Sequence, residues 1–161
     1  MPIELSADQV WQVIDKELFA VVGMVTSHGE ARTAGVVYVV RDHKLYIVTG
    51  RETWKARHIA CNPHVSVTIP IAKRVPIMPW MKIPAATITF AGTARVFPTQ
   101  EAPPELLHAL LHGADPNADT VADSCMIEVT PEKEFVTYGI GTPLMQMRFP
   151  EKARGRAPVG V

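Results

Sequence analysis

The sequence predicts a mainly β protein with flanking helices, in which six or seven antiparallel strands form a closed or nearly closed barrel. With 161 residues, 47% of them hydrophobic, the chain has the length and apolar content of one globular domain. Its 14 prolines favour many short elements over a helical bundle, because proline is excluded from helix interiors. Apolar, β-branched runs separated by turn signals recur along the chain and predict the strands.

The first third of the chain predicts one helix and three strands. Ser6 and Gln9 form a capping-box pattern, and apolar residues recur at helical spacing as far as Leu18. After this helix, strands are expected at 19–27, 31–40 and 45–49. The turns between them are short, so we expect an antiparallel meander.

The middle of the chain returns to a short helix between strands. Residues 50–61 are helical in composition, with Thr53 as the N-cap and Asn62-Pro63 as the stop signal. Strands are expected at 64–69 and 86–97, the second with a bulge or barrel corner at Gly92. Residues 70–85 contain four prolines and predict a loop, which we call the proline loop.

The last third predicts a helix, two strands and a tail. A helix is expected from Pro103 to His112, followed by strands at 124–130 and 134–138 around a turn at 131–133. Residues 148–161 are basic and contain Pro and Gly, so we expect a tail that is flexible unless a partner subunit holds it. The predicted domain is therefore residues 1–147, with the tail outside it.

Composition excludes several classes of protein. Sixteen Lys and Arg balance sixteen Asp and Glu, which argues against a nucleic-acid or anionic-membrane partner. Cys61 and Cys125 have no metal-ligand or disulfide spacing. The N-terminus lacks a basic leader, and the apolar runs are too short to span a bilayer, so we expect a cytoplasmic protein.

The neutral total hides a segregation of charge. Residues 53–100 contain six Lys and Arg and no Asp or Glu, whereas the segments on both sides are acidic. This pattern indicates a local anion site. The alternative is that acidic residues of other segments pair with these bases.

Thr53 and Lys55 fall in the first turn of the helix expected after residue 50. Unpaired backbone N–H groups and the helix dipole favour a phosphate at such a position. A Thr hydroxyl and a Lys ammonium would complete a phosphate clamp. The alternative is an N-cap followed by a solvated lysine.

Residues 19–69, and less strongly 87–97, resemble the pyridoxamine 5'-phosphate oxidase-like family of FMN-binding split β-barrels. The resemblance lies in a series of motifs: a hairpin with G-x-x-x-x-x-x-V, Y-x-x-T at the end of a strand, S/T-x-K-A opening a helix, an N-P stop and V-S-V. It implies FMN as cofactor. The implied binding residues are Arg32, Thr33, Ala34, Gly35, Val36, Val48, Thr49, Gly50, Thr53, Trp54, Lys55 and, from the partner subunit's copy of the strand, Thr87.

The resemblance further implies a homodimer with two flavin sites at its interface, across which apolar residues of the proline loop would pack. Two departures argue against vitamin B6 oxidation: Trp54 stands where the oxidase has arginine, and the oxidase's arginine-rich C-terminal segment has no clear match in residues 139–161. Relatives that use the deazaflavin F420 or bind haem share the barrel. The F420 alternative would use Lys55 with Lys73, Arg74 and Lys82 of the proline loop.

The expected function is flavin-dependent hydride transfer at N5, to or from a small substrate. No catalytic residue is expected, since no triad, carboxylate pair or GxGxxG is present; Tyr38, Trp80 and Arg148 are candidates for substrate contact. No metal site is expected either, because His108 and His112 lack the glutamate of a zinc-protease motif. A non-enzymatic flavin or haem binder is the remaining alternative.

Overall fold

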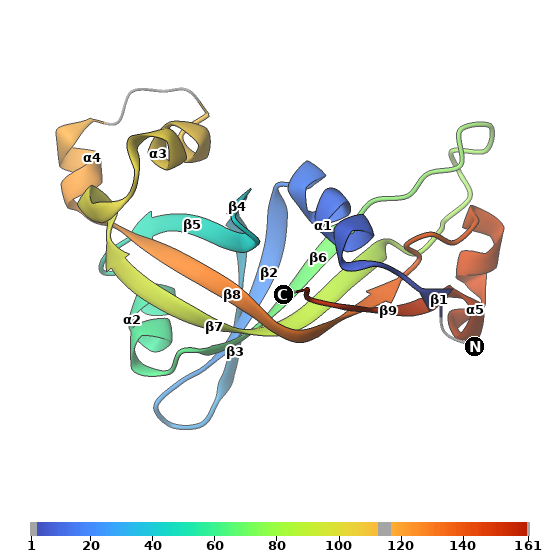
Figure 1. Cartoon of the computed structure of the whole chain (residues 1–161), viewed down its shortest axis with the longest axis horizontal. Helices are drawn as coiled ribbons and strands as arrows, with labels where there is room; N and C mark the ends of the chain where they lie inside the picture. The colour runs from blue at the N-terminus through green and yellow to red at the C-terminus, as the bar shows by residue number, and fades with distance from the viewer. Residues whose placement is uncertain (1–2, 113–116, 161) are drawn as a thin grey trace.

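The computed structural model describes residues 3–112 and 117–160, which form one mixed sheet of nine strands flanked by short helices (Figure 1). The strands are β1 (Ile3–Glu4), β2 (Phe19–Val25), β3 (Ala31–Val37), β4 (Val39–Arg41), β5 (Lys44–Gly50), β6 (His64–Ile71), β7 (Ala86–Pro98), β8 (Ser124–Tyr138) and β9 (Arg154–Pro158). The helices are α1 (Ala7–Lys16), α2 (Trp54–Cys61), η1 (Thr99–Glu101), α3 (Pro104–Leu110), α4 (Ala118–Ala122), η2 (Leu144–Arg148) and α5 (Pro150–Ala153).

The strands close into a barrel because β3 and β4 act as one bent strand, interrupted only at Tyr38. β3 pairs with β2, and β4 pairs with β5. β5 continues to β8, and the ring returns through β7 and β6 to β2. The predicted mainly β barrel with flanking helices is therefore confirmed.

The expected meander is present, because β4 continues β3 and pairs antiparallel with β5, which also pairs with β8 on its other side. One detail of the predicted topology is wrong. The expected turn at 131–133 is absent, and β8 runs unbroken from Ser124 to Tyr138. Pro131 lies opposite Gly92, next to a register shift at which β8 holds extra residues between Glu132 and Val136, so the strand pair bends here without reversing.

The tail is also more ordered than predicted. Residues 150–153 form α5, and β9 pairs with both β8 and β1. Within β9, Gly155 and Ala157 face inward and are buried, while Arg154 and Arg156 are exposed. This alternation supplies the apolar contacts that hold a strand on the sheet, so no partner subunit is needed to order it.

α1 covers the inner face of the sheet, as its sequence predicts. Ser6 forms both hydrogen bonds of a capping box with Gln9. Val10, Trp11 and Ile14 are buried in the main core, and Trp11 meets the Phe135 ring edge-on. The opposite, outer face carries Phe19 and Val37, which are each 43% exposed and pair directly across β2 and β3.

Candidate functional site

The junction between β5 and α2 brings together three of the predicted cofactor-binding residues. Thr49 and Thr53 place their Oγ1 atoms 3.3 Å apart, and Thr53 Oγ1 donates to the Gly50 carbonyl at 2.8 Å. Thr53 is the N-cap of α2, as predicted, because its Oγ1 also accepts the Ala56 N–H. These contacts fix the turn that leads the chain into the helix.

The first turn of α2 leaves backbone donors open toward solvent. Ala56 and Arg57 donate to Thr53, whereas the N–H groups of Trp54 and Lys55 have no acceptor in the part of the chain that the structure describes. A pocket of about 550 Å³ lies against this turn. Its lining residues are Gly50, Arg51, Glu52, Thr53 and Asp123. Open N–H groups at a helix start are a favourable environment for an anion.

The pocket lining carries charges of both signs, Arg51 against Glu52 and Asp123. A second cation, Lys55, lies in the adjoining helix turn. Burial raises the pKa of the Cys125 thiol, while the charges of Arg51 and Lys55 act to lower it, so both cations lie close to the start of β8. Lys55 forms no ion pair with any residue within 3–112 or 117–160. Its ammonium therefore remains available to a bound anion.

Some bases of the acid-free segment have acidic partners elsewhere, which is the alternative that the sequence left open. Arg57 pairs with Glu52 at 2.6 Å, and Arg95 pairs with Glu128 at 3.3 Å. These two arginines therefore already have acidic partners, although both remain 65% exposed. Their ion pairs distinguish these arginines from Lys55, and the sequence alone could not make this distinction.

β3 presents its predicted residues on two different faces. Ala34 and Val36 pack toward the main core, whereas Thr33 and Gly35 are exposed on the outer face. Arg32 pairs with Glu30 at 2.6 Å and remains half exposed. Thr33 is therefore the predicted side chain of this strand that is open on the outer face, where Gly35 lies beside the Phe19 ring.

Phe19 is a residue of this region that the sequence reasoning missed. A Cβ atom added at Gly35 would lie 2.9 Å from the Phe19 ring, so the ring covers the glycine. The sequence did contain a signal for this contact, because Phe19 begins the first strand of the predicted hairpin and therefore faces the end of its second strand. The cross-strand register of the hairpin was needed to see it.

Arg51 and Asp123 are two further residues that the sequence reasoning missed. Both line the pocket at α2, and the Arg51 N–H donates to the Asp123 carbonyl at 2.9 Å. Asp123 precedes β8, which lies beside β5 only because of a strand pairing between distant parts of the chain. No local pattern signals such a contact.

The remaining predicted residues lie elsewhere. The Val48 side chain is partly buried against a second apolar cluster that contains Leu106 and Met126. Thr87 lies on β7 between Pro70 and Tyr138, at the far end of the sheet from α2. Within one protomer Thr87 is therefore separate from the pocket at α2, and its predicted contribution needs a second copy of the chain.

Tyr38 has a structural role. Its hydroxyl is buried and donates to the Ile14 carbonyl at 2.7 Å, and burial raises the pKa of this phenol above its ordinary range. Tyr38 is thus no candidate for substrate contact. Between residues 3 and 112 and between 117 and 160, no three His, Cys, Asp or Glu side chains gather as metal ligands.

The family model described as pyridoxamine 5'-phosphate oxidase matches residues 6–138. Together with the closed barrel and the helix start at α2, this match shows that the chain belongs to the pyridoxamine 5'-phosphate oxidase-like split-barrel family. Its members include F420 reductases and haem-binding proteins. No curated protein matches the sequence.

Solved structures with the same fold have different functions in their names. An F420 reductase is 20% identical, with 75% of this chain and 91% of that chain covered and a TM-score of 0.55. A haem storage protein from Vibrio cholerae is 12% identical, with 83% and 94% covered and a TM-score of 0.63. A haem-binding protein from Mycobacterium smegmatis is 17% identical, with 83% and 53% covered and a TM-score of 0.58. At these identities the likeness establishes the fold alone. None of the helices described is long and apolar enough to cross a membrane.

Proposed function

We propose that this chain binds FMN and acts as a flavin-dependent oxidoreductase on a small substrate. The observation that carries the proposal is the open first turn of α2, where the N–H groups of Trp54 and Lys55 have no acceptor in the described residues and directly follow Thr53, which lines a pocket. The Lys55 ammonium, which forms no ion pair in the described residues, belongs to the same turn. A phosphate monoester fits this set of donors, since it is a compact anion with several acceptor oxygens.

The outer face supports the ring of the same cofactor. Gly50 has no side chain, so a flat ring system can approach the backbone at the end of β5, whereas the Phe19 ring lies over Gly35 of β3. When bound, FMN supplies hydride transfer at N5. The protein holds the phosphate, orients the ring and leaves one face open, and it needs no acid or base of its own.

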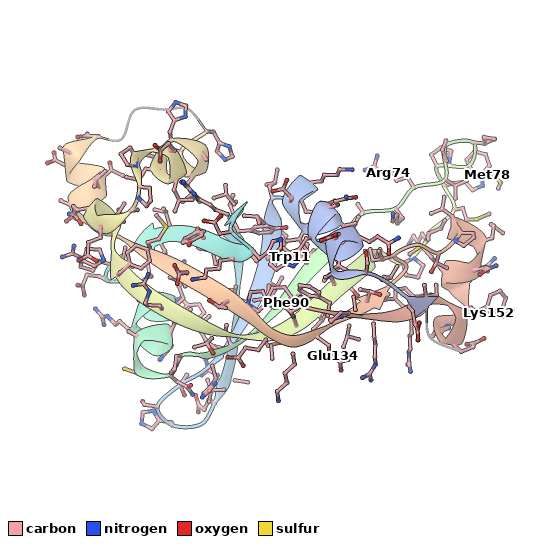
Figure 2. All side chains as sticks on the ribbon, in the orientation of Figure 1. Trp11, Arg74, Met78, Phe90, Glu134 and Lys152 are labelled. Atoms are coloured by element: carbon pink, nitrogen blue, oxygen red, sulfur yellow. The ribbon has the colours of Figure 1, made fainter. Side chains whose placement is uncertain are left out.

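FMN fits the position of the cations better than F420 does. Arg74 and the rest of the proline loop lie at the end of the protomer opposite α2, so within one protomer they cannot extend the clamp at Lys55 along a longer anionic tail (Figures 1 and 2). Haem binding has no comparable support in the residues of this pocket.

The homodimer is part of the same proposal. The outer face carries exposed apolar residues on separate strands: Phe19, Val37 and Val136 are each 43% exposed. The register places them on one face, because Val21, Thr68, Thr89 and Val136 are successive cross-strand neighbours. A second copy packed here would cover this surface and bring its Thr87 toward the ring.

The test is an FMN titration of the purified full chain, followed by flavin fluorescence. Lys55→Ala should weaken binding about tenfold or more, because a charged phosphate contact contributes about 1.5 to 3 kcal/mol. Lys16→Ala, which removes an exposed lysine of α1, is the matched control and should bind as the wild type does. An unchanged affinity of Lys55→Ala would show that the clamp is assigned to the wrong residue.

The absorption spectrum of the chain as purified separates the cofactors. Flavin bands support the proposal, whereas a Soret band would favour haem, and binding of F420 without FMN would favour the deazaflavin reductase.

For the dimer, Val136→Arg should shift the mass measured by light scattering from dimer to monomer. A wild-type chain that is monomeric at micromolar concentration would contradict this part of the proposal.

A further inference from the structure

Two long connections leave the sheet at the same end. Ile71 pairs with Ala86 and Thr87 with Tyr138, which in turn pairs with Arg154. The proline loop, between β6 and β7, and residues 139–153, between β8 and β9, therefore begin and end side by side. Their bases are packed together, because a Cβ at Gly139 would touch both Ala86 and Met147.

The tip of the proline loop exposes large apolar side chains. Ile77 is 86% exposed and Trp80 is 76% exposed, the two highest values among the large hydrophobic residues. A tight turn, closed by the Met81 N–H donating to the Met78 carbonyl at 3.0 Å, holds them at the tip. The neighbouring connection adds Met145 and Phe149, which are 56% and 51% exposed.

Cations lie on the same two connections as these apolar side chains. The proline loop contains Lys73, Arg74 and Lys82 and no acidic residue. None of the three forms an ion pair with a residue in the described ranges. In the neighbouring connection, the Lys152 ammonium lies 5.1 Å from the centre of the Phe149 ring.

We propose that this end of the molecule is a docking surface for an anionic phospholipid membrane. Trp and other large apolar side chains partition into the interface of a bilayer, and Lys and Arg beside them meet the phosphate and carboxylate groups of the lipid heads. An exposed Trp and Ile with three unpaired cations on one loop combine both requirements. The zero net charge of the chain argues against a general anionic partner, so this contact is confined to one end.

The proline loop lies away from the face proposed for the second copy of the chain. Figure 2 shows Arg74 and Met78 on the side of the sheet that carries Trp11, whereas Glu134 lies on the opposite side. Glu134 belongs to the outer face, like Val136 two residues later. A dimer built on the outer face therefore leaves the loop free, which differs from the expectation that its apolar residues pack across the dimer interface. The lipid surface is the occupant to which the charge of the loop is complementary.

The experiment is sedimentation of the full chain with vesicles, either of phosphatidylcholine alone or with roughly one-third phosphatidylserine. We expect binding to the anionic vesicles only, weakening as salt is added, with a shift of tryptophan emission to shorter wavelength. No binding to anionic vesicles, or equal binding to both kinds, would overturn the proposal.

Variants identify the loop as the surface. The K73Q/K82Q double variant should bind anionic vesicles about 25-fold more weakly, at about fivefold per cation, while K16Q/K133Q should bind as the wild type does. W80S should weaken binding about tenfold, and L18S, which changes an exposed leucine outside the loop, should not.

If W80S instead converts a dimer to a monomer and vesicle binding is unaffected, the loop is a contact between copies and the proposal is wrong. Circular dichroism of each variant checks its fold, and FMN binding by each variant is expected to be unchanged, since the loop is separate from the pocket at α2.

Discussion

The Thr130 carbonyl oxygen lies 2.7 Å from the position that a Cβ atom would occupy at Gly92. This approach occurs where β7 and β8 bend together, with Gly92 opposite Pro131. No real Cβ tolerates a backbone oxygen at that distance, so the position requires glycine. The sequence prediction that Gly92 marks an irregularity in the strand is explained by this contact.

Gly92→Ala should therefore destabilise the fold by about 1 to 3 kcal/mol, because two paired backbones must separate to admit a methyl group. Urea denaturation measures the change. Gly23→Ala is the matched control, since its Cβ would lie 3.5 Å from the nearest atom, an ordinary contact. Equal stability of the two variants would show that the bend relaxes freely.

Glu128 joins three strands. Its carboxylate accepts hydrogen bonds from Tyr46 Oη at 3.0 Å, Arg95 at 3.3 Å and Lys44 at 3.4 Å. Glu128→Gln removes the charge that these donors share. We expect a loss of about 1 kcal/mol in unfolding free energy, because Arg95 and Lys44 are exposed enough to be rehydrated. Glu105→Gln, at an exposed pair with Arg41, should cost less. A larger loss for Glu105→Gln would contradict the ranking.

The same carboxylate predicts a pH dependence. Burial acts to raise the pKa of Glu128, but hydrogen bonds from Arg95 and Tyr46, with the charge of Lys44, lower it below its ordinary value of 4.5. The stabilisation is therefore present above about pH 4.5 and is lost as the pH falls through the lowered value. Urea midpoints from about pH 6 to about pH 3 should fall more steeply for the wild type than for Glu128→Gln. Parallel curves would show that Glu128 does not contribute.

Tyr38→Phe should destabilise the protein by about 1 to 2 kcal/mol, because it leaves the buried Ile14 carbonyl without its donor. FMN affinity should not change, since this hydroxyl faces the core. Thermal unfolding and an FMN titration of the same preparation measure both quantities. A weaker affinity with unchanged stability would restore Tyr38 as a ligand-contacting residue.

Local signals in the sequence predicted the elements well, because caps and strand patterns act over a few residues. Ser6 and Thr53 begin helices where their hydroxyls predict it. The errors arose where distant segments decide the structure. Pro131 reads as a turn signal, yet it lies opposite Gly92 in a continuous strand, and residues 154–158 read as a tail, yet they pair with β8.

The candidate site shows the same division. The helix start at Thr53 and Lys55 could be predicted, since a cap and a cation in one turn are local features. The roles of Arg51 and Asp123 could not, because they depend on the pairing of β5 with β8. Nor could the sequence separate Lys55 from Arg57, whose pairing with Glu52 depends on side-chain geometry in the folded helix.

Thr53 combines a structural and a binding role, and two substitutions can distinguish them. Thr53→Ala removes the cap of α2 and should cost about 1 kcal/mol in stability. If the hydroxyl also contacts the phosphate, FMN binding should weaken about tenfold. Thr53→Ser keeps the oxygen and should preserve both. Asn117→Ala removes the cap of α4, whose side chain accepts the Asp119 N–H, and should cost stability without changing FMN affinity. Because the Thr53 oxygen already binds Gly50 and Ala56, a loss of stability with full FMN affinity in Thr53→Ala would assign it to the cap alone and leave the phosphate to Lys55 and the open N–H groups.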